Sequence, residues 1–162
     1  FDKINENFIR CSFFELCSRY LSSYYTFAIE QNNSVGCSNF EMTGIPGTNY
    51  YKDDRLVEFK YFKAKDATMV EALKVVRPED ADQVRRYAAD INRQFPAYRM
   101  RAYVVYIAAG KVCKTWEVIN LLCKGQDMRH LLIIYYVLIG NIYYAIERGI
   151  YPSLNDIPIF FI

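Results

Sequence analysis

Residues 55–62 read Arg-Leu-Val-Glu-Phe-Lys-Tyr-Phe, and this stretch decides the fold class. It is mostly apolar and aromatic, as strands often are, and the side chains of a strand alternate between two faces. Glu58 and Lys60 therefore project from one face, whereas Val57 and Phe59 project from the other. An acid and an amine are costly to bury unless they pair or bind an ion. The stretch predicts a buried strand that carries either a salt bridge or part of a metal site.

One helix and two strands are predicted upstream of this strand. Residues 5–21 place apolar side chains at roughly helical spacing, which predicts a helix with one buried face. Residues 24–30 predict a strand that a polar turn at 31–34 closes, and residues 38–43 predict a second strand. The expected buried positions of the helix are Phe8, Cys11, Phe14, Leu16 and Leu21.

Downstream, the pattern changes to a helix and two more strands. Pro78 suits a first helical turn, and the following acids suit the positive end of the helix dipole, so a helix is predicted to about Phe95. Residues 99–108 and 112–118 predict strands, and a short helix is expected at 67–75. This order predicts an α/β fold with a mixed sheet of four or five strands flanked by helices. The apolar stripe of the long helix is Ala81, Val84, Tyr87, Ala88 and Ile91.

Length and composition bound the possibilities. A chain of 162 residues is the size of one ordinary domain, and a formal charge of +2 gives no strong electrostatic signature. Any nucleic-acid contact must therefore come from local clusters of charge. Five scattered cysteines and a single histidine favour reduced, buried thiols in a cytoplasmic protein over a zinc site. Because the chain starts with Phe1, we expect a fragment of a longer protein.

The last part of the chain has a different texture. Residues 131–146 form an apolar run that is about sixteen residues long, slightly below the roughly eighteen that suggest a membrane span. Three interpretations stay open for it: a core or interface helix, which we favour, a membrane segment, or translated sequence past a lost reading frame. We therefore predict one domain at 1–118 and a hydrophobic tail of uncertain status at 119–162, and we do not expect a membrane partner.

Four short motifs occur in a fixed order: Glu30, residues 36–40 (Gly-Cys-Ser-Asn-Phe), residues 57–61 (Val-Glu-Phe-Lys-Tyr) and residues 82–87 (Asp-Gln-Val-Arg-Arg-Tyr). In this order and spacing they resemble the PD-(D/E)XK nuclease superfamily, in particular the domain found behind AAA-ATPase-like domains in many gut bacteria. The usual pattern there is Gly-Arg-x-Asp, a hydrophobic Glu-x-Lys strand and a Gln-hydrophobic-x-x-Tyr helix. The resemblance implies a restriction-endonuclease-like core of order αβββαβ.

The resemblance also implies roles for individual residues. Glu58 matches a metal-binding carboxylate, and Lys60 matches the lysine that assists the attacking water. Gln83 is expected to line the site, and Glu30 is a candidate accessory acid. The implied activity is hydrolysis of nucleic acid, in particular DNA, with Mg²⁺ or Mn²⁺ as cofactor. An ATPase-like domain is the implied partner, and it would lie upstream because this chain has no phosphate-binding GxxxxGK[ST] loop.

The sequence departs from the pattern at the other half of the site. Asn39 stands where the family has the second metal-binding aspartate, and Cys37 stands where it has arginine. An amide oxygen can ligate Mg²⁺ but brings no charge, so weak metal binding and attenuated chemistry are expected. Glu41 lies two residues on and faces the same side, so it is an alternative source of the carboxylate. Two other interpretations stay open: a dead site in a module that binds nucleic acid or docks on an ATPase domain, and a decaying gene.

Overall fold

The structure, a computed structural model, describes residues 5–33, 36–108 and 112–121, all of which belong to one compact unit spanning residues 1–126. For residues 30–33, 36–39, 120 and 121 the description is limited to the backbone. The hydrophobic tail and its three interpretations therefore lie outside the described residues, apart from the end of the last strand. The elements, in chain order, are α1 (Glu6–Leu21), β1 (Tyr25–Asn33), β2 (Gly36–Gly44), β3 (Asp53–Phe62), a 3-10 turn (Ala64–Asp66), α2 (Ala67–Ala72), α3 (Pro78–Gln94), β4 (Arg99–Ala108) and β5 (Val112–Leu121).

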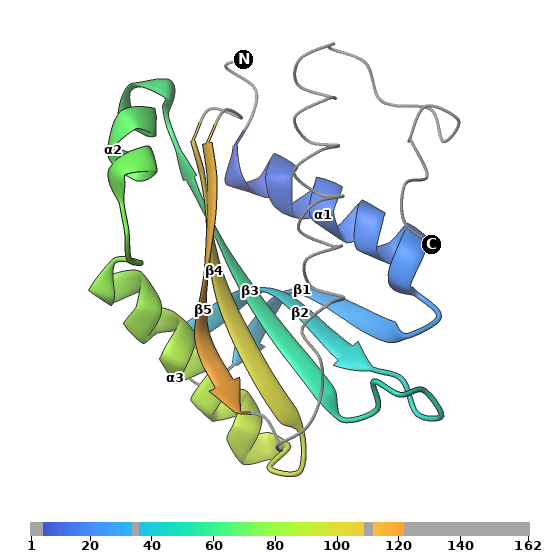
Figure 1. Ribbon diagram of the computed structural model, residues 1–162. Coiled ribbons are helices and arrows are strands. Elements are labelled where there is room, and N and C mark those ends of the chain that lie inside the picture. Colours follow the sequence, from blue (N-terminus) through green and yellow to red (C-terminus); the bar gives the residue numbers. More distant parts are fainter. Residues whose placement is uncertain (1–4, 34–35, 109–111, 122–162) are drawn as a thin grey trace. The chain divides into compact units, whose positions relative to one another are not determined.

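The five strands form one mixed sheet in the order β1-β2-β3-β4-β5 (Figure 1). β3 and β4 are parallel, and their register runs from Asp53 opposite Arg99 to Phe62 opposite Ala108. The other three neighbouring pairs are antiparallel. A parallel pair needs a crossover connection, and α2 and α3 supply it between β3 and β4. The predicted α/β class and the mixed sheet flanked by helices are confirmed.

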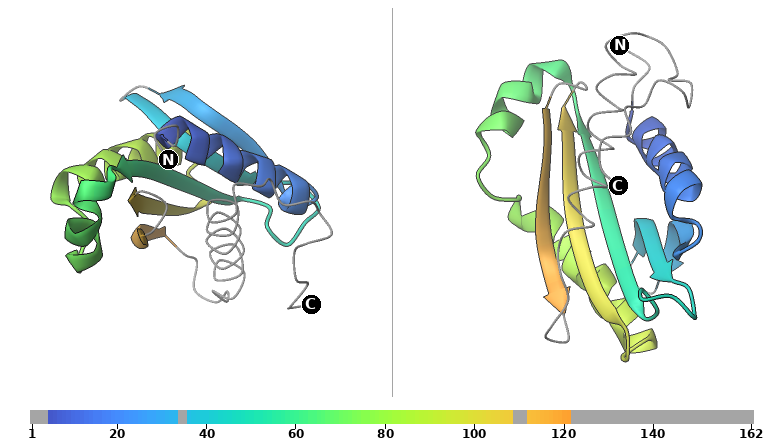
Figure 2. Two further views of the ribbon diagram at one scale, coloured as in Figure 1. Left: turned by 90° about the horizontal axis from the view of Figure 1, so that it is seen from above. Right: turned by 45° about the vertical axis from the view of Figure 1, so that its right-hand side comes forward.

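Helices cover both faces of the sheet (Figure 2). On one face, Phe13 of α1 makes edge-on ring contacts with Phe40 of β2 and Phe59 of β3, at centroid separations of 4.8 and 5.1 Å. On the other face, α3 packs its apolar stripe against Leu56 of β3 and alternate residues of β4. All five positions predicted for that stripe are buried, and α3 ends at Gln94 with Phe95 as its C-cap, close to the predicted end. The face of β3 that carries Glu58 and Lys60 is the one beneath α3.

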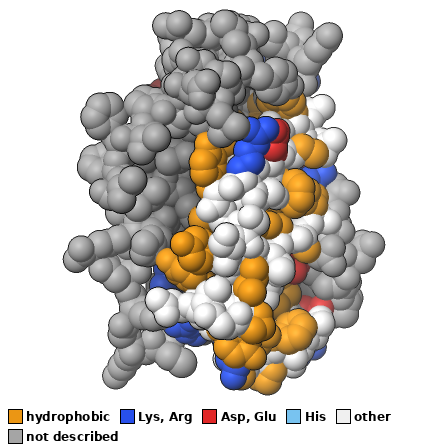
Figure 3. Space-filling model, turned by 90° about the vertical axis from the view of Figure 1, so that its right-hand side faces the viewer, with side chains coloured by type: hydrophobic (Ala, Val, Ile, Leu, Met, Phe, Trp, Pro, Cys, Tyr) orange, Lys and Arg blue, Asp and Glu red, His pale blue; other side chains and the backbone are white. Residues whose placement is uncertain are grey.

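The buried face of α1 differs from the predicted one. Ile9, Phe13 and Cys17 are buried, whereas Phe8 and Phe14 are 40% and 36% exposed. The predicted stripe is wrong because apolar residues lie around much of this helix, so spacing alone does not identify the face that meets the sheet. Asn5 begins α1 by accepting a hydrogen bond from the backbone N–H of Phe8. The space-filling view in Figure 3 shows hydrophobic side chains on the surface of the molecule.

The β1–β2 hairpin is longer than predicted. Residues 31–33 were expected to form a turn, but β1 continues to Asn33, which pairs with Gly36. β2 pairs with β3 only from Phe40 to Thr43 in the described residues. Beyond Phe40, toward the turn of the hairpin, β1 and β2 pair only with each other in this part of the chain. A two-stranded ladder of this kind does not require apolar side chains, and a polar composition is therefore a poor guide to its end. The short helix α2 also stops at Ala72, before the predicted Val75.

Two further expectations concern the thiols and the membrane. Burial raises the pKa of the Cys17 thiol and that of Cys113 to about 12, which agrees with inert cysteines. Cys11 is exposed, so the expectation of buried thiols is wrong for it. Among the described residues, no helix has both the length and the apolar character needed to cross a membrane.

Candidate active site

Glu58 and Lys60 lie on β3, on the face that α3 covers. Glu58 is only 2% exposed, and its neighbours on this face include Leu56 of the same strand and Val104 directly opposite on β4. A carboxylate in such surroundings is stable only if other groups hydrogen-bond to it. The side chain of Lys60 is 25% exposed, so its ammonium lies at the edge of the buried region.

Three predicted site residues meet in a triangle of hydrogen bonds. The Nζ of Lys60 donates to Oε1 of Glu58 at 2.9 Å and to Oε1 of Gln83 at 3.2 Å. The Nε2 of Gln83 donates to the same Oε1 of Glu58 at 3.1 Å. Gln83 lies on α3, and the hydroxyl of Tyr87, one turn further on, accepts from its Nε2 at 3.0 Å. The helix therefore supplies an amide that bridges the acid and the ammonium.

Two more carboxylates act on Lys60 that the sequence analysis did not assign to the site. Oδ1 of Asp80, in the first turn of α3, lies 4.0 Å from Nζ of Lys60. Glu6 of α1 contributes a longer-range charge interaction. Burial alone would lower the pKa of Lys60, but the hydrogen bond and charge of Glu58, together with the charges of Asp80 and Glu6, outweigh it and raise this pKa. The ammonium therefore carries its charge at neutral pH.

Little in the sequence indicates that Asp80 and Glu6 lie near Lys60. Asp80 follows Pro78 and Glu79 in the first helical turn, where acids are common because they complement the helix dipole. Glu6 has the same ordinary explanation at the start of α1. A signal was available in the spacing, since Asp80, Gln83 and Tyr87 are three and four residues apart and so share one helix face.

The predicted second half of the site is described less fully. Asn39 and Cys37 belong to β2 and Glu30 to β1, but their side chains lie outside the description. Asn39 precedes Phe40, the first residue of β2 that pairs with β3. Glu41 pairs with Leu56 and is half-buried, so it lies on the same face as Glu58 and diagonally across from it. Such diagonal neighbours are about 7–8 Å apart, within reach of a shared ion for long side chains.

The oxygen donors near Glu58 fit a hard cation. Mg²⁺ is usually bound through one or two carboxylates, with water and phosphate oxygens completing its shell, and Glu58 with Glu41 matches that donor type. In the described residues no group of three or more His, Cys, Asp and Glu side chains is gathered closely enough to hold a metal ion. A divalent cation at Glu58 would therefore need ligands beyond the carboxylates that this part of the chain gathers.

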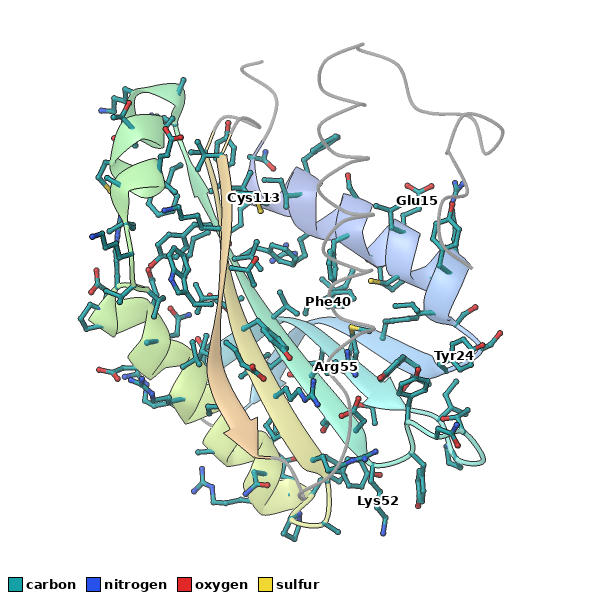
Figure 4. The ribbon with its side chains drawn as sticks, in the orientation of Figure 1. Glu15, Tyr24, Phe40, Lys52, Arg55 and Cys113 are labelled. Carbon is teal, nitrogen blue, oxygen red and sulfur yellow. The ribbon has the colours of Figure 1, made fainter. Side chains whose placement is uncertain are left out.

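A second acid-x-base pair lies at the start of β3. Nε and Nη2 of Arg55 donate to Oδ2 of Asp53 at 2.9 and 2.7 Å, and the Tyr25 hydroxyl donates to the same oxygen at 2.8 Å. The guanidinium also lies over the Tyr25 ring, 5.2 Å from its centroid. Asp53 and Arg55 are 5% and 7% exposed. Arg55, labelled in Figure 4, belongs to the sheet face opposite Glu58, because the two are an odd number of residues apart.

Comparisons with known proteins agree with this geometry. The sequence profile of the PD-(D/E)XK nuclease superfamily matches residues 4–117, well over half of the chain. No curated protein matches the sequence. Nucleases of this superfamily typically use divalent metals and act on nucleic acid. With its mixed sheet and its Glu58, Lys60 and Gln83 triangle, the chain is a nuclease-like domain that belongs to the PD-(D/E)XK nuclease superfamily.

Proposed function

We propose that this domain hydrolyses phosphodiester bonds of DNA with the help of Mg²⁺ or Mn²⁺, at a rate lowered by Asn39. The observation that carries the proposal is the hydrogen-bonded triangle of Glu58, Lys60 and Gln83. It combines a buried acid, an ammonium at the edge of solvent and an amide that contacts both. The acid and the ammonium match the Glu-x-Lys strand of the superfamily pattern, and the amide matches its Gln-containing helix.

Each residue of the site has a proposed role. A divalent cation, when bound, polarises the phosphate and lowers the pKa of a coordinated water. Glu58 and Asn39 are the proposed ligands, with Glu41 as a further candidate and Glu30 as an accessory acid. The Lys60 ammonium donates hydrogen bonds to the attacking water or to a phosphoryl oxygen, and its charge offsets the negative charge that develops there.

The proposed attenuation comes from charge. Mg²⁺ held by one or two carboxylates depends on their negative charge, and the neutral Asn39 removes one of them. The weakest step is therefore expected to be metal binding rather than the placement of Lys60. Millimolar Mn²⁺ is expected to support more activity than the same concentration of Mg²⁺, because a given set of ligands usually holds Mn²⁺ more tightly than Mg²⁺.

Basic side chains next to the site are proposed to contact the DNA backbone. Lys63 and Lys65 follow β3 directly, and Arg86 lies on α3, and all three are exposed. Arg85 and Arg93 instead pair with Asp82 and Asp90 of the same helix, each at 2.7 Å. Salt should weaken binding, since each neutralised phosphate releases counterions.

A cleavage assay tests the proposal. Supercoiled plasmid and single-stranded DNA are incubated with Mg²⁺ or Mn²⁺ and with the wild type, Lys60→Ala, or an Asn39→Asp, Cys37→Arg repair. The repaired form should cut fastest, and Lys60→Ala in that background should lose on the order of 100-fold in rate, as for the loss of one transition-state donor. If the repaired form is folded and does not cut, the nuclease proposal is wrong.

The same assay separates the alternatives. A catalytically dead module that binds nucleic acid or docks on an ATPase-like domain is favoured by Asn39, and it would bind DNA or that domain without cutting. If the wild type already cuts and Glu41→Ala abolishes cutting, Glu41 supplies the second carboxylate and attenuation is wrong. A bacterial origin, an upstream ATPase-like domain and a cytoplasmic location are part of the proposal, and the upstream gene sequence would test the second of these.

A further inference from the structure

Asp80 is a second acid beside Lys60, and no motif of the sequence assigns it a role. It lies at the third position of α3 and is 9% exposed. An acid at this helix position commonly points to solvent near the free N–H groups of its own helix. Here it is turned toward the sheet, with Oδ1 4.0 Å from Nζ of Lys60. That separation is in the range of an ion pair but beyond a direct hydrogen bond.

Tyr106 holds Asp80 in this orientation. Its hydroxyl donates a hydrogen bond to Oδ2 of Asp80 and accepts one from the backbone N–H of Arg77 at 3.3 Å. The Tyr106 side chain is fully buried, and its ring packs against Phe62 and Trp116 at centroid separations of 4.9 and 5.0 Å. The donor is therefore fixed, and one oxygen of Asp80 is occupied while the other faces Lys60.

The arrangement matters because the Lys60 ammonium and a divalent cation would compete for the carboxylate of Glu58. Its Oε1 accepts hydrogen bonds from Lys60 and Gln83. If Glu58 also holds a divalent cation, that cation and the ammonium repel each other and draw on the same carboxylate charge. Lys60 then loses part of its nearest counter-charge while its side chain remains largely buried, which is unfavourable.

We propose that Asp80 is a positioning residue that takes over as the counter-ion of Lys60 when Glu58 binds a divalent cation, with Tyr106 fixing Asp80 for that purpose. The inference rests on the proposed metal-binding role of Glu58. A shift of the ammonium by about one ångström toward Asp80 brings the pair from 4.0 Å into hydrogen-bond range. Lys60 thus stays beside the site without blocking the carboxylate that the cation needs.

Mn²⁺ affinity tests the inference without requiring cleavage. Mn²⁺ alone is titrated into the full chain by calorimetry or by electron paramagnetic resonance, with circular dichroism as the check that each variant is folded. Asp80→Asn should weaken Mn²⁺ binding about tenfold, the order of magnitude of one partly buried charge interaction. Tyr106→Phe should weaken it less, and it serves as the second variant if Asp80→Asn does not fold.

Asp82→Asn is the matched control. Asp82 lies two residues further along the same helix, its side chain is 59% exposed, and it pairs with Arg85 rather than with Lys60. Its removal takes away the same charge from the same helix and should leave Mn²⁺ affinity within about twofold, because exposed charges are well screened. An equal loss for Asp82→Asn and Asp80→Asn would overturn the inference in favour of a general charge effect.

A double-mutant cycle separates positioning from direct attraction of the cation. In a Lys60→Met background there is no ammonium to accommodate, so adding Asp80→Asn should change Mn²⁺ affinity by less than about twofold. A tenfold loss in that background would mean that Asp80 attracts the cation itself, and the positioning role would be wrong. If the wild type and the Asn39→Asp repair bind no Mn²⁺, the metal site of the proposed function fails and the inference fails with it. If they bind and Asp80→Asn binds equally well, the inference alone fails.

Discussion

β3 carries two pairs with the same spacing, an acid followed two residues later by a base, and they behave differently. Asp53 and Arg55 begin the strand on one face of the sheet, and Glu58 and Lys60 lie further along on the other. Both acids are almost fully buried, at 5% and 2% exposure. In each cluster a tyrosine also donates to a carboxylate, Tyr25 in the first and Tyr106 in the second.

The difference lies in how the base is held. Arg55 donates twice to a single oxygen of Asp53 and stacks on an aromatic ring, so its partners leave it little freedom. Lys60 is a quarter exposed, and its acceptors come from two elements, β3 and α3. Arginine suits fixed, planar pairing, whereas lysine is a compact charge on a flexible stem. The spacing of an acid and a base along a strand therefore does not identify a site; the element that faces the pair does.

The largest loss of stability is expected when the pair of Asp53 and Arg55 is disrupted. Asp53→Ala leaves the Arg55 guanidinium buried without its carboxylate, which should lower the free energy of unfolding by about 3–5 kcal/mol. Urea unfolding followed by circular dichroism measures it. Asp82→Ala, at an exposed ion pair, is the control and should cost no more than about 1 kcal/mol. Equal losses for the two variants would show that the buried pair of Asp53 and Arg55 contributes no more to stability than an exposed ion pair.

A smaller loss of stability is expected when the pair of Glu58 and Lys60 is disrupted. Lys60→Met removes the hydrogen bonds of the ammonium to Glu58 and to Gln83, but Gln83 continues to donate to the same Glu58 oxygen. The free energy of unfolding should therefore fall by about 1.5–3 kcal/mol, the range for one hydrogen bond to a charged group. Urea unfolding in parallel with Asp53→Ala gives the ranking. A loss at Lys60 that equals or exceeds the loss at Asp53 would mean that both pairs are structural.

The smallest effect concerns pH. Burial raises the pKa of Tyr25, and the neighbouring Asp53 adds to this against the opposing charge of Arg55. Because the folded-state pKa lies above the ordinary tyrosine value of about 10, this stabilisation is complete below pH 10 and is lost as pH rises beyond it. Tyr25→Phe should make the alkaline decline shallower by up to about 1.4 kcal/mol per pH unit.

Unfolding curves between pH 8 and pH 11 measure this slope. Tyr103→Phe is a useful companion, since burial, with the charge of Glu117, raises the pKa of Tyr103 to about 12 and gives the same sign. Tyr24→Phe is the control, because Tyr24 is 46% exposed. A slope that stays the same in Tyr25→Phe would show that this phenol ionises as easily in the folded state as in the unfolded one.

The sequence predicted the parts of the molecule where one signal dominated. The stripe of α3 was predicted in full because polar residues separate its apolar positions clearly, and β4 was predicted to the residue because its composition is aromatic and β-branched. Glu58, Lys60 and Gln83 were expected together, and they meet. The face of α1 was missed because the helix is apolar on several sides.

Asp80 and Tyr106 were missed for a different reason. Each has an ordinary local explanation, an acid in a first helical turn and an aromatic residue in a buried strand, and only the packing of α3 on β4 brings them together. They are 26 residues apart in the chain, so no local pattern connects them. Asn39 and Glu30 remain predictions, since their side chains lie outside the described part of the chain.

The rotation of α3 about its own axis limits where residues can be inserted without disrupting the site. Asp80, Gln83 and Tyr87 reach the site from one helix, and the same helix packs Val84 and Ala88 into the core. Inserting one residue between positions 80 and 87 would turn part of this row by about 100° and move an acid or an amide away from β3. Insertions before Pro78 would leave the row intact. Length variation among relatives should therefore gather in the connection between β3 and α3, and the first three turns of α3 should keep a constant length.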